Sequence, residues 1–157
     1  QQTNIEPDLI TIAKGMGNGF PVGGLLLHPR FEASYGLLGT TFGGNHLACA
    51  ATLAVLEVIE TEKLLDNATT MGNYLIQQFQ QLQGIKEVRG RGLMIGLQLE
   101  QTAAPIRKKL LFEHAIFTGS SSEKNTIRLL PPLNISIHEA DLLLAGLSTI
   151  LKSETVC

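Results

Sequence analysis

The stretch DLITIAKGMGNGFPVGG, residues 8–24, decides how the first part of this chain is expected to fold. Residues 9–13 are apolar and strand-favouring, and they are bounded by Pro7 and by a loop that holds five glycines. This pattern predicts a buried β-strand. Lys14 stands where the strand ends and the glycine loop begins, so its side chain is the first candidate for chemistry.

Lys14 allows two interpretations. A lone lysine is usually a solvated surface charge. A lysine at the end of a buried strand is instead partly desolvated, which favours the neutral amine, and a neutral amine next to a carbonyl forms a Schiff base. The neighbouring glycines would let a flat ligand approach closely. The loop GMGNGFPVGG fits neither the nucleotide P-loop pattern nor G-x-G-x-x-G.

A second strand is predicted at residues 22–27, followed by a Gly- and Thr-rich loop at residues 36–45. This loop, with Asn45 as a plausible N-cap, precedes a helix, so it fits either an anion site or a simple helix cap with a tight turn. The apolar positions of that helix recur at helical spacing and predict one buried stripe: Leu47, Ala50, Ala51, Ala54, Val55 and Val58. A second helical stripe runs from Leu64 to Leu82.

The remainder of the chain predicts a compact α+β region. Its expected elements are a turn at Gly90–Gly92, an apolar strand at residues 93–99, a short helix at 103–113, a short strand at 115–118, a strand at 126–130 and a last helix that opens with a capping box formed by Ser136 and Glu139.

Composition narrows the possible partners. The 157 residues are 44% hydrophobic and carry a net charge of −2, without basic or acidic blocks. This argues against nucleic acid or an anionic membrane as the main partner. The two cysteines, Cys49 and Cys157, form no metal-binding or disulfide pattern. Cys49 is expected to be a small buried thiol, and a reducing cytoplasm fits this usage.

Four segments together resemble the class III, fold-type I, pyridoxal-phosphate-dependent aminotransferases. They are EPDLITIAKGMGNGFPVGG, GTTFGGNHLACAATLAVLEVIE, VRGRGLMIGLQL and IRLLPPLNIS, and they follow the family's order over nearly the whole chain. The wording LLGTTFGGNHLACAA is most similar to the acetylornithine and succinylornithine aminotransferase branch.

The resemblance implies an α/β fold, the C-terminal part of a pyridoxal-phosphate-dependent transferase. Residues 1–45 would end the large-domain sheet, residues 46–84 would form linking helices, and residues 85–157 would form a small α+β C-terminal domain. The family's aspartate beneath the pyridine nitrogen, its ring-stacking aromatic and its glycine-led phosphate loop match nothing in these residues. This part is therefore expected to be inactive alone.

The resemblance also implies roles at matching positions. Lys14 matches the lysine that bonds the cofactor, pyridoxal 5'-phosphate, and moves the substrate proton. Thr41 matches a residue that binds the cofactor phosphate from the neighbouring subunit of a homodimer, and Thr40 matches a position at the acylornithine. Arg128 matches an arginine that receives a carboxylate of 2-oxoglutarate, a task for which a planar guanidinium is suited. Arg89 and Arg91 are expected to support a turn.

The expected activity is transfer of the δ-amino group of N-acetyl- or N-succinyl-ornithine to 2-oxoglutarate, in arginine biosynthesis. Two alternatives stay open. The substrate could be another ω-amine, such as ornithine or 4-aminobutyrate, or the chain could be an inactive dimerisation or binding module. No nucleic acid or membrane partner is expected, and the expected location is the cytoplasm.

Overall fold

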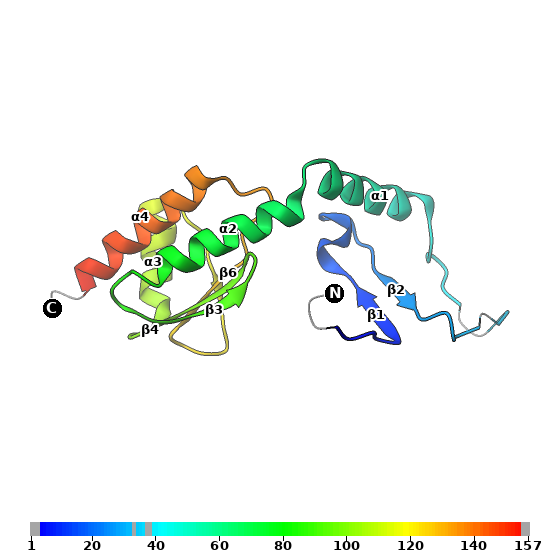
Figure 1. Ribbon diagram of the computed structural model, residues 1–157, viewed down its shortest axis with the longest axis horizontal. Helices are drawn as coiled ribbons and strands as arrows, with labels where there is room; N and C mark the ends of the chain where they lie inside the picture. The colour runs from blue at the N-terminus through cyan, green and yellow to red at the C-terminus, as the bar shows by residue number, and fades with distance from the viewer. Residues whose placement is uncertain (1–3, 33, 37–38, 155–157) are drawn as a thin grey trace. The chain divides into compact units, whose positions relative to one another are not determined.

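The computed structural model describes residues 4–32, 34–36 and 39–154. The chain divides into two compact units, Gln1–Glu62 and Lys63–Cys157 (Figure 1). The two helices expected to link the domains therefore fall into different units. The first unit contains β1 (Leu9–Ile12), the 3-10 helix η1 (Lys14–Gly17), β2 (Gly24–Leu27) and α1 (His46–Thr61).

β1 and β2 form an antiparallel hairpin whose register runs from Leu9 opposite Leu27 to Ile12 opposite Gly24. Both predicted strands are confirmed, but the predicted burial is wrong. Leu9 is 51% exposed and Leu26 is 56% exposed. A two-stranded ribbon has no second layer to cover its faces, so apolar side chains on both sides of the hairpin stay in contact with solvent.

α1 begins where the sequence predicted. The side chain of Asn45 caps it by accepting a hydrogen bond of 3.0 Å from the backbone N–H of Ala48. The predicted buried stripe is wrong in this unit, because Ala48 is the one buried residue of the helix while Leu47 is 72% exposed. Cys49 is exposed too, so the expected buried thiol is a further error. The helix thus offers an apolar face that the described residues of its unit leave uncovered.

The second unit is built on a four-stranded antiparallel sheet in the order β3-β4-β6-β5. Its elements are α2 (Leu64–Phe79), β3 (Ile85–Arg91), β4 (Met94–Leu99), α3 (Ala103–His114), β5 (Gly119–Ser120), β6 (Thr126–Leu129) and α4 (Ile137–Glu154).

The strand predicted at residues 115–118 is wrong. Ala115 instead ends α3 in the left-handed conformation, with φ 56°. The N–H of Ile116 then bonds the carbonyl of Leu110 at 2.9 Å, which closes the helix end. Strand pairing starts only at Gly119.

One face of this sheet is buried beneath the helices. Ile95, Leu97 and Leu99 alternate along β4 at 1% exposure or less, whereas Met94 on the opposite face is 67% exposed. The buried side chains of β4 and β6 join those of α2, α3 and α4 in a single core. The predicted stripe of the last helix is confirmed, since all four of its members are buried: Leu143, Leu147, Ile150 and Leu151.

α2 lies unusually close to the β3–β4 turn. A Cβ atom placed on Gly72 would lie 2.5 Å from the carbonyl carbon and 2.7 Å from the Cα of Gly92. Gly92 adopts φ 52°, which a glycine reaches without strain. Two glycines therefore allow backbone to pack directly against backbone.

Gly72→Ala should destabilise the second unit by about 1–3 kcal/mol, because overpacking against fixed backbone outweighs the roughly 1 kcal/mol by which alanine favours a helix. Urea unfolding followed by circular dichroism measures this change. Asn73→Ala, one residue along on an exposed position of the same helix, is the control and should change stability by less than about 0.5 kcal/mol. A Gly72→Ala protein as stable as the parent would contradict the close packing.

The predicted capping box of α4 is confirmed. The backbone N–H and the hydroxyl of Ser136 each donate to Oε2 of Glu139 at 2.8 Å, and the N–H of Glu139 donates to Oγ of Ser136 at 3.3 Å. The backbone hydrogen bond, followed by the hydroxyl hydrogen bond, holds the pKa of Glu139 below its ordinary value.

A lowered pKa in the folded state means that this carboxylate stabilises the protein above its ordinary pKa and loses that effect as the pH falls through the folded-state pKa. Glu139→Gln should therefore lower the free energy of unfolding at pH 7, with a difference from the parent that shrinks toward about pH 3. Urea unfolding across this range tests it, with Glu100→Gln, an exposed residue, as control. A difference that stays constant with pH would refute this role for the carboxylate.

Candidate functional site

Lys14 is the first residue of η1 and has a left-handed backbone, with φ 57°. A non-glycine residue in this region typically carries about 1–3 kcal/mol of strain, and such strain concentrates at functional sites. Its side chain is exposed, so the expected desolvation at a buried strand end is not found in this unit. Within the described ranges its ammonium has no hydrogen-bond or ion-pair partner, which leaves the amine free to meet a ligand.

The glycine loop behind Lys14 is tightly folded. The N–H of Met16 bonds the carbonyl of Ala13 at 3.3 Å, and the N–H of Phe20 bonds that of Gly17 at 3.0 Å. A Cβ atom on Gly17 would lie only 2.6 Å from Cγ1 of Val22. The glycine thus permits a compact turn, and this turn fixes the direction in which the chain leaves Lys14.

Thr40 and Thr41 lie in the loop that leads into α1, and both are exposed. Neither hydroxyl has a partner among the residues that the structure describes. The side-chain amide of Asn45 closes the loop by donating to the carbonyl of Phe42 at 2.9 Å, while its oxygen caps α1. The helix-cap interpretation of this loop is confirmed, and the two open hydroxyls leave an anion site feasible beside it.

Lys14 and Thr41 belong to different segments of the first unit. Lys14 begins η1, which contacts α1 and lies near the C-terminal part of that helix in Figure 1. Thr41 lies in the loop that leads into the N-terminal end of α1, a helix of 16 residues and about 24 Å. Among the described residues, no hydrogen bond joins the side chains of Lys14 and Thr41.

Arg128 lies on β6 in the second unit, on the outer face of the sheet, and its side chain is exposed. In register, its neighbours across the sheet are Gly96 on β4 and Gly119 on β5. Arg89 on β3 is opposite Gly96, so it shares this face. No ion-pair partner of Arg128 occurs within residues 4–32, 34–36 and 39–154.

Arg89 is neutralised by a residue that the sequence did not single out. Its Nη2 lies 2.6 Å from Oε2 of Glu123, and Thr126 donates to the same oxygen at 2.8 Å. The hydrogen bond from Arg89, followed by that from Thr126, lowers the pKa of Glu123. No spacing rule would have revealed this pair, because Glu123 comes from the loop between β5 and β6, 34 residues along the chain.

A shallow hollow of about 480 Å³ lies over the outer face of the sheet. Its charged lining residues are Arg89, Arg91, Glu123 and Arg128. With Arg89 paired, Arg91 and Arg128 are positive charges there without an ion-pair partner among the described residues. The hollow therefore suits an anionic ligand, and Arg128 suits a carboxylate because its guanidinium can donate two parallel hydrogen bonds.

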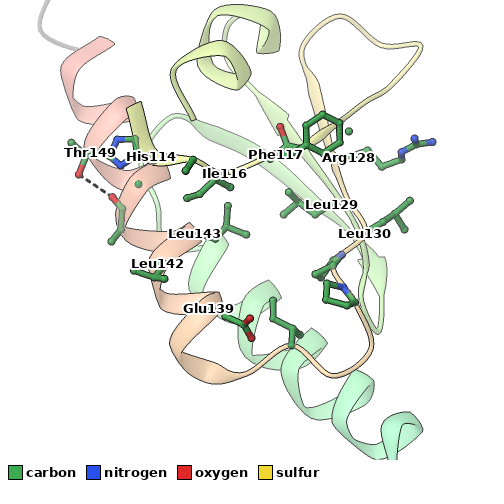
Figure 2. Close-up of a pocket in the computed structure, with 18 residues that line it drawn as sticks. His114, Ile116, Phe117, Arg128, Leu129, Leu130, Glu139, Leu142, Leu143 and Thr149 are labelled. Carbon is green, nitrogen blue, oxygen red and sulfur yellow. Dashed lines mark hydrogen bonds between the residues drawn. The ribbon is translucent and has the colours of Figure 1, made fainter. Parts of the chain in front are cut away.

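A cavity of about 870 Å³ in the second unit also borders Arg128. Figure 2 shows Arg128 extending away from this cavity, while Leu129, Leu142 and Leu143 line it. Two of its polar groups are engaged: Glu139 belongs to the capping box, and Thr149 donates to the carbonyl of Ala145 at 2.9 Å. The buried hydroxyl of Thr118, also in the lining, has no hydrogen-bond partner among the described residues. The rest of the lining is mostly apolar.

The described residues contain no cluster of three or more histidine, cysteine, aspartate or glutamate side chains able to hold a metal ion. None of their helices combines the length and apolar character needed to cross a membrane.

Comparison with known proteins decides the family. The sequence profile of aminotransferase class-III matches residues 1–151. The chain belongs to the class-III aminotransferase family. An acetylornithine aminotransferase of Nitrosomonas europaea is 36% identical over 157 residues, 96% of this chain and 39% of that protein. The acetylornithine aminotransferase of Methanocaldococcus jannaschii is 42% identical over 152 residues, 93% of this chain and 38% of that protein.

Solved structures agree with this family. An ornithine δ-aminotransferase of Plasmodium falciparum superimposes with a TM-score of 0.82 at 29% identity, over 95% of this chain and 41% of that one. An acetylornithine aminotransferase of Elizabethkingia anophelis superimposes with a TM-score of 0.84 at 26% identity, over 97% of this chain and 42% of that one. The expected α/β class and partial transferase fold are therefore confirmed, and the chain spans about two fifths of the length of its relatives.

Proposed function

We propose that the protein carrying this chain transfers the δ-amino group of N-acetyl- or N-succinyl-ornithine to 2-oxoglutarate, with pyridoxal 5'-phosphate as cofactor. The observation that carries the proposal is the 32% to 43% identity with acetylornithine aminotransferases over most of the chain. These relatives favour the acylated amine. The solved structures, at 25% to 29% identity, include both ornithine and acetylornithine aminotransferases and do not separate the two substrates.

The residues present fit the cofactor. Pyridoxal phosphate supplies an electron sink for the substrate carbon that loses a proton. Lys14 offers an exposed amine and Thr41 offers a hydroxyl in the loop that leads into α1, and neither has a partner among the described residues. A hydrogen bond from this hydroxyl to a phosphate would contribute about 1.5–3 kcal/mol, enough to assist binding but not to provide all of it.

Lys14 has two tasks in this proposal. Its Nζ would hold the cofactor covalently, a task for which the primary amine of a lysine is suited. The same Nζ would take the proton from the substrate carbon and later return it. The tight turn at Gly17 helps these tasks by fixing the backbone that follows Lys14.

Thr41 would act across a homodimer interface, and Thr40 would contact the acylornithine beside it. Two features support this arrangement. The loop with Thr41 leads into the N-terminal end of α1, whereas η1 lies near the C-terminal part of that helix in Figure 1, which supports delivery of Thr41 by a second subunit. The exposed apolar residues of α1, among them Leu47, Leu53 and Leu56, would be covered by such a contact.

The domain assignment stays a prediction for the longer protein. Residues 1–45 would complete the large cofactor-binding domain, residues 46–84 would link the domains, and residues 85–157 would be the small domain. The exposed hairpin of β1 and β2 supports the first part, since strands that are apolar on both faces are typical of a covered inner sheet. The exposed thiol of Cys49 fits a reducing cytoplasm.

A second candidate is transfer from free ornithine or 4-aminobutyrate, and the ornithine aminotransferases among the structural neighbours favour the former. The full-length protein, assayed with N-acetyl-ornithine, N-succinyl-ornithine, ornithine and 4-aminobutyrate against 2-oxoglutarate, distinguishes these amines. The proposal expects kcat/KM for an acylated ornithine to exceed the others by at least tenfold, about 1.4 kcal/mol. A kcat/KM for free ornithine equal to or higher than that for the acylated ornithines would overturn the proposed substrate in favour of free ornithine.

Lys14→Arg keeps the charge but removes the primary amine, so activity should fall about a thousandfold or more. Lys63→Arg is the matched control, because Lys63 is also exposed and left-handed, with φ 53°. It should retain parental activity. Full activity of the Lys14→Arg protein would end the catalytic assignment, and absence of activity in the parent would favour a binding module.

A further inference from the structure

Arg128 stands between two glycines on the outer face of the sheet. Its cross-strand neighbours are Gly96 on β4 and Gly119 on β5. Directly opposed residues of antiparallel strands point to the same face. Side chains at either position would therefore flank the arginine, and glycine at both leaves open space beside it.

The side chain of Arg128 lies over only one of these two glycines. A Cβ atom on Gly119 would lie 3.1 Å from Nε and 3.5 Å from Cβ of Arg128, and 3.0 Å from its carbonyl oxygen. A Cβ atom on Gly96 would meet Cγ2 of Thr126 at 3.7 Å and the carbonyl oxygen of Arg89 at 3.8 Å, with no atom of Arg128 within 4 Å. The arginine side chain therefore leans over β5, across Gly119.

Backbone conformation does not explain the glycine at residue 119. Neither Gly119 nor Gly96 has a positive φ angle, so other residues could adopt both backbones. What distinguishes Gly119 is contact, because any side chain there would enter the volume next to the Nε atom of Arg128.

The direction of Arg128 matters because Arg89, which lies on the same face of the sheet, already forms an ion pair. Arg89 is held by Glu123 at 2.6 Å. A carboxylate entering this face would therefore meet Arg128 as an unpaired guanidinium, and bidentate binding depends on the orientation of the guanidinium plane.

We propose that Gly119 is a positioning residue that sets the direction of the Arg128 guanidinium and thereby the affinity for the dicarboxylate acceptor. The inference rests on the proposed function, in which Arg128 receives a carboxylate of 2-oxoglutarate. Gly119 itself touches no substrate, and it acts by the absence of a side chain.

The test compares Gly119→Ala and Gly119→Val with Gly96→Ala in the full-length protein. KM and kcat are measured separately for 2-oxoglutarate and for the amino donor, and the inhibition constant of glutarate gives a reading of carboxylate binding without turnover. Since a displacement of about 1 Å can cost about a hundredfold, Gly119→Ala should raise KM for 2-oxoglutarate and the inhibition constant of glutarate about three- to tenfold. Gly119→Val should raise them further.

The KM for the amino donor and the melting temperature should stay at parental values in Gly119→Ala. Gly96 lines the hollow but its added Cβ has ordinary contact distances and meets no atom of Arg128. Gly96→Ala should therefore raise KM for 2-oxoglutarate and the inhibition constant of glutarate less than Gly119→Ala does. If Gly119→Val fails to fold, Gly119→Ala decides the result by itself.

Arg128→Ala separates the carboxylate-binding role of Arg128 from the positioning role of Gly119. If it raises KM for 2-oxoglutarate while the Gly119 variants do not, the positioning role is overturned and the proposed function stands. If Arg128→Ala leaves KM for 2-oxoglutarate unchanged, the carboxylate role of Arg128 fails and the inference fails with it. If the Gly119 variants impair the kinetic constants for the amino donor and for 2-oxoglutarate equally and also lower the melting temperature, the role of Gly119 is only structural.

Discussion

One-sided burial of the sheet in the second unit is the constraint on which the rest of that unit depends. β4 places Ile95, Leu97 and Leu99 in the core at 1% exposure or less. Because side chains alternate along a strand, a slip of one residue would turn every buried side chain outward. The apolar pattern therefore fixes the register, and the register places Arg128 between Gly96 and Gly119.

The two units differ in how far their own residues can bury their apolar side chains. In the second unit, α2 packs backbone to backbone at Gly72, and α4 starts at a satisfied capping box. The first unit holds the candidate cofactor residues but leaves its hairpin and α1 largely exposed. Lys14 and Thr41 thus lie on a surface that the described residues of this unit leave exposed, and the chain spans about two fifths of the length of its relatives.

The sequence predicted local features well and tertiary ones unevenly. Helix starts at Asn45 and Ser136 were correct, because caps are decided by neighbouring residues. Burial of α1 was wrong, because an apolar stripe shows what a helix can bury but not whether a partner is present. The Arg89–Glu123 pair and the contact of Gly119 with Arg128 were missed, since both depend on strand pairing between distant segments. Lys14 was singled out by its position between a predicted strand and a glycine loop, whereas the threonines and Arg128 were found by family motifs. The roles of all four stay predictions.

The central proposal is that Lys14 is the residue that bonds the cofactor. The most direct measurement incubates the full-length protein with pyridoxal 5'-phosphate, reduces it with borohydride and maps the modified peptide by mass spectrometry. The proposal predicts one label per chain, on Lys14. Label on Lys63 or Lys124, or label scattered at low occupancy over the surface lysines, would contradict it.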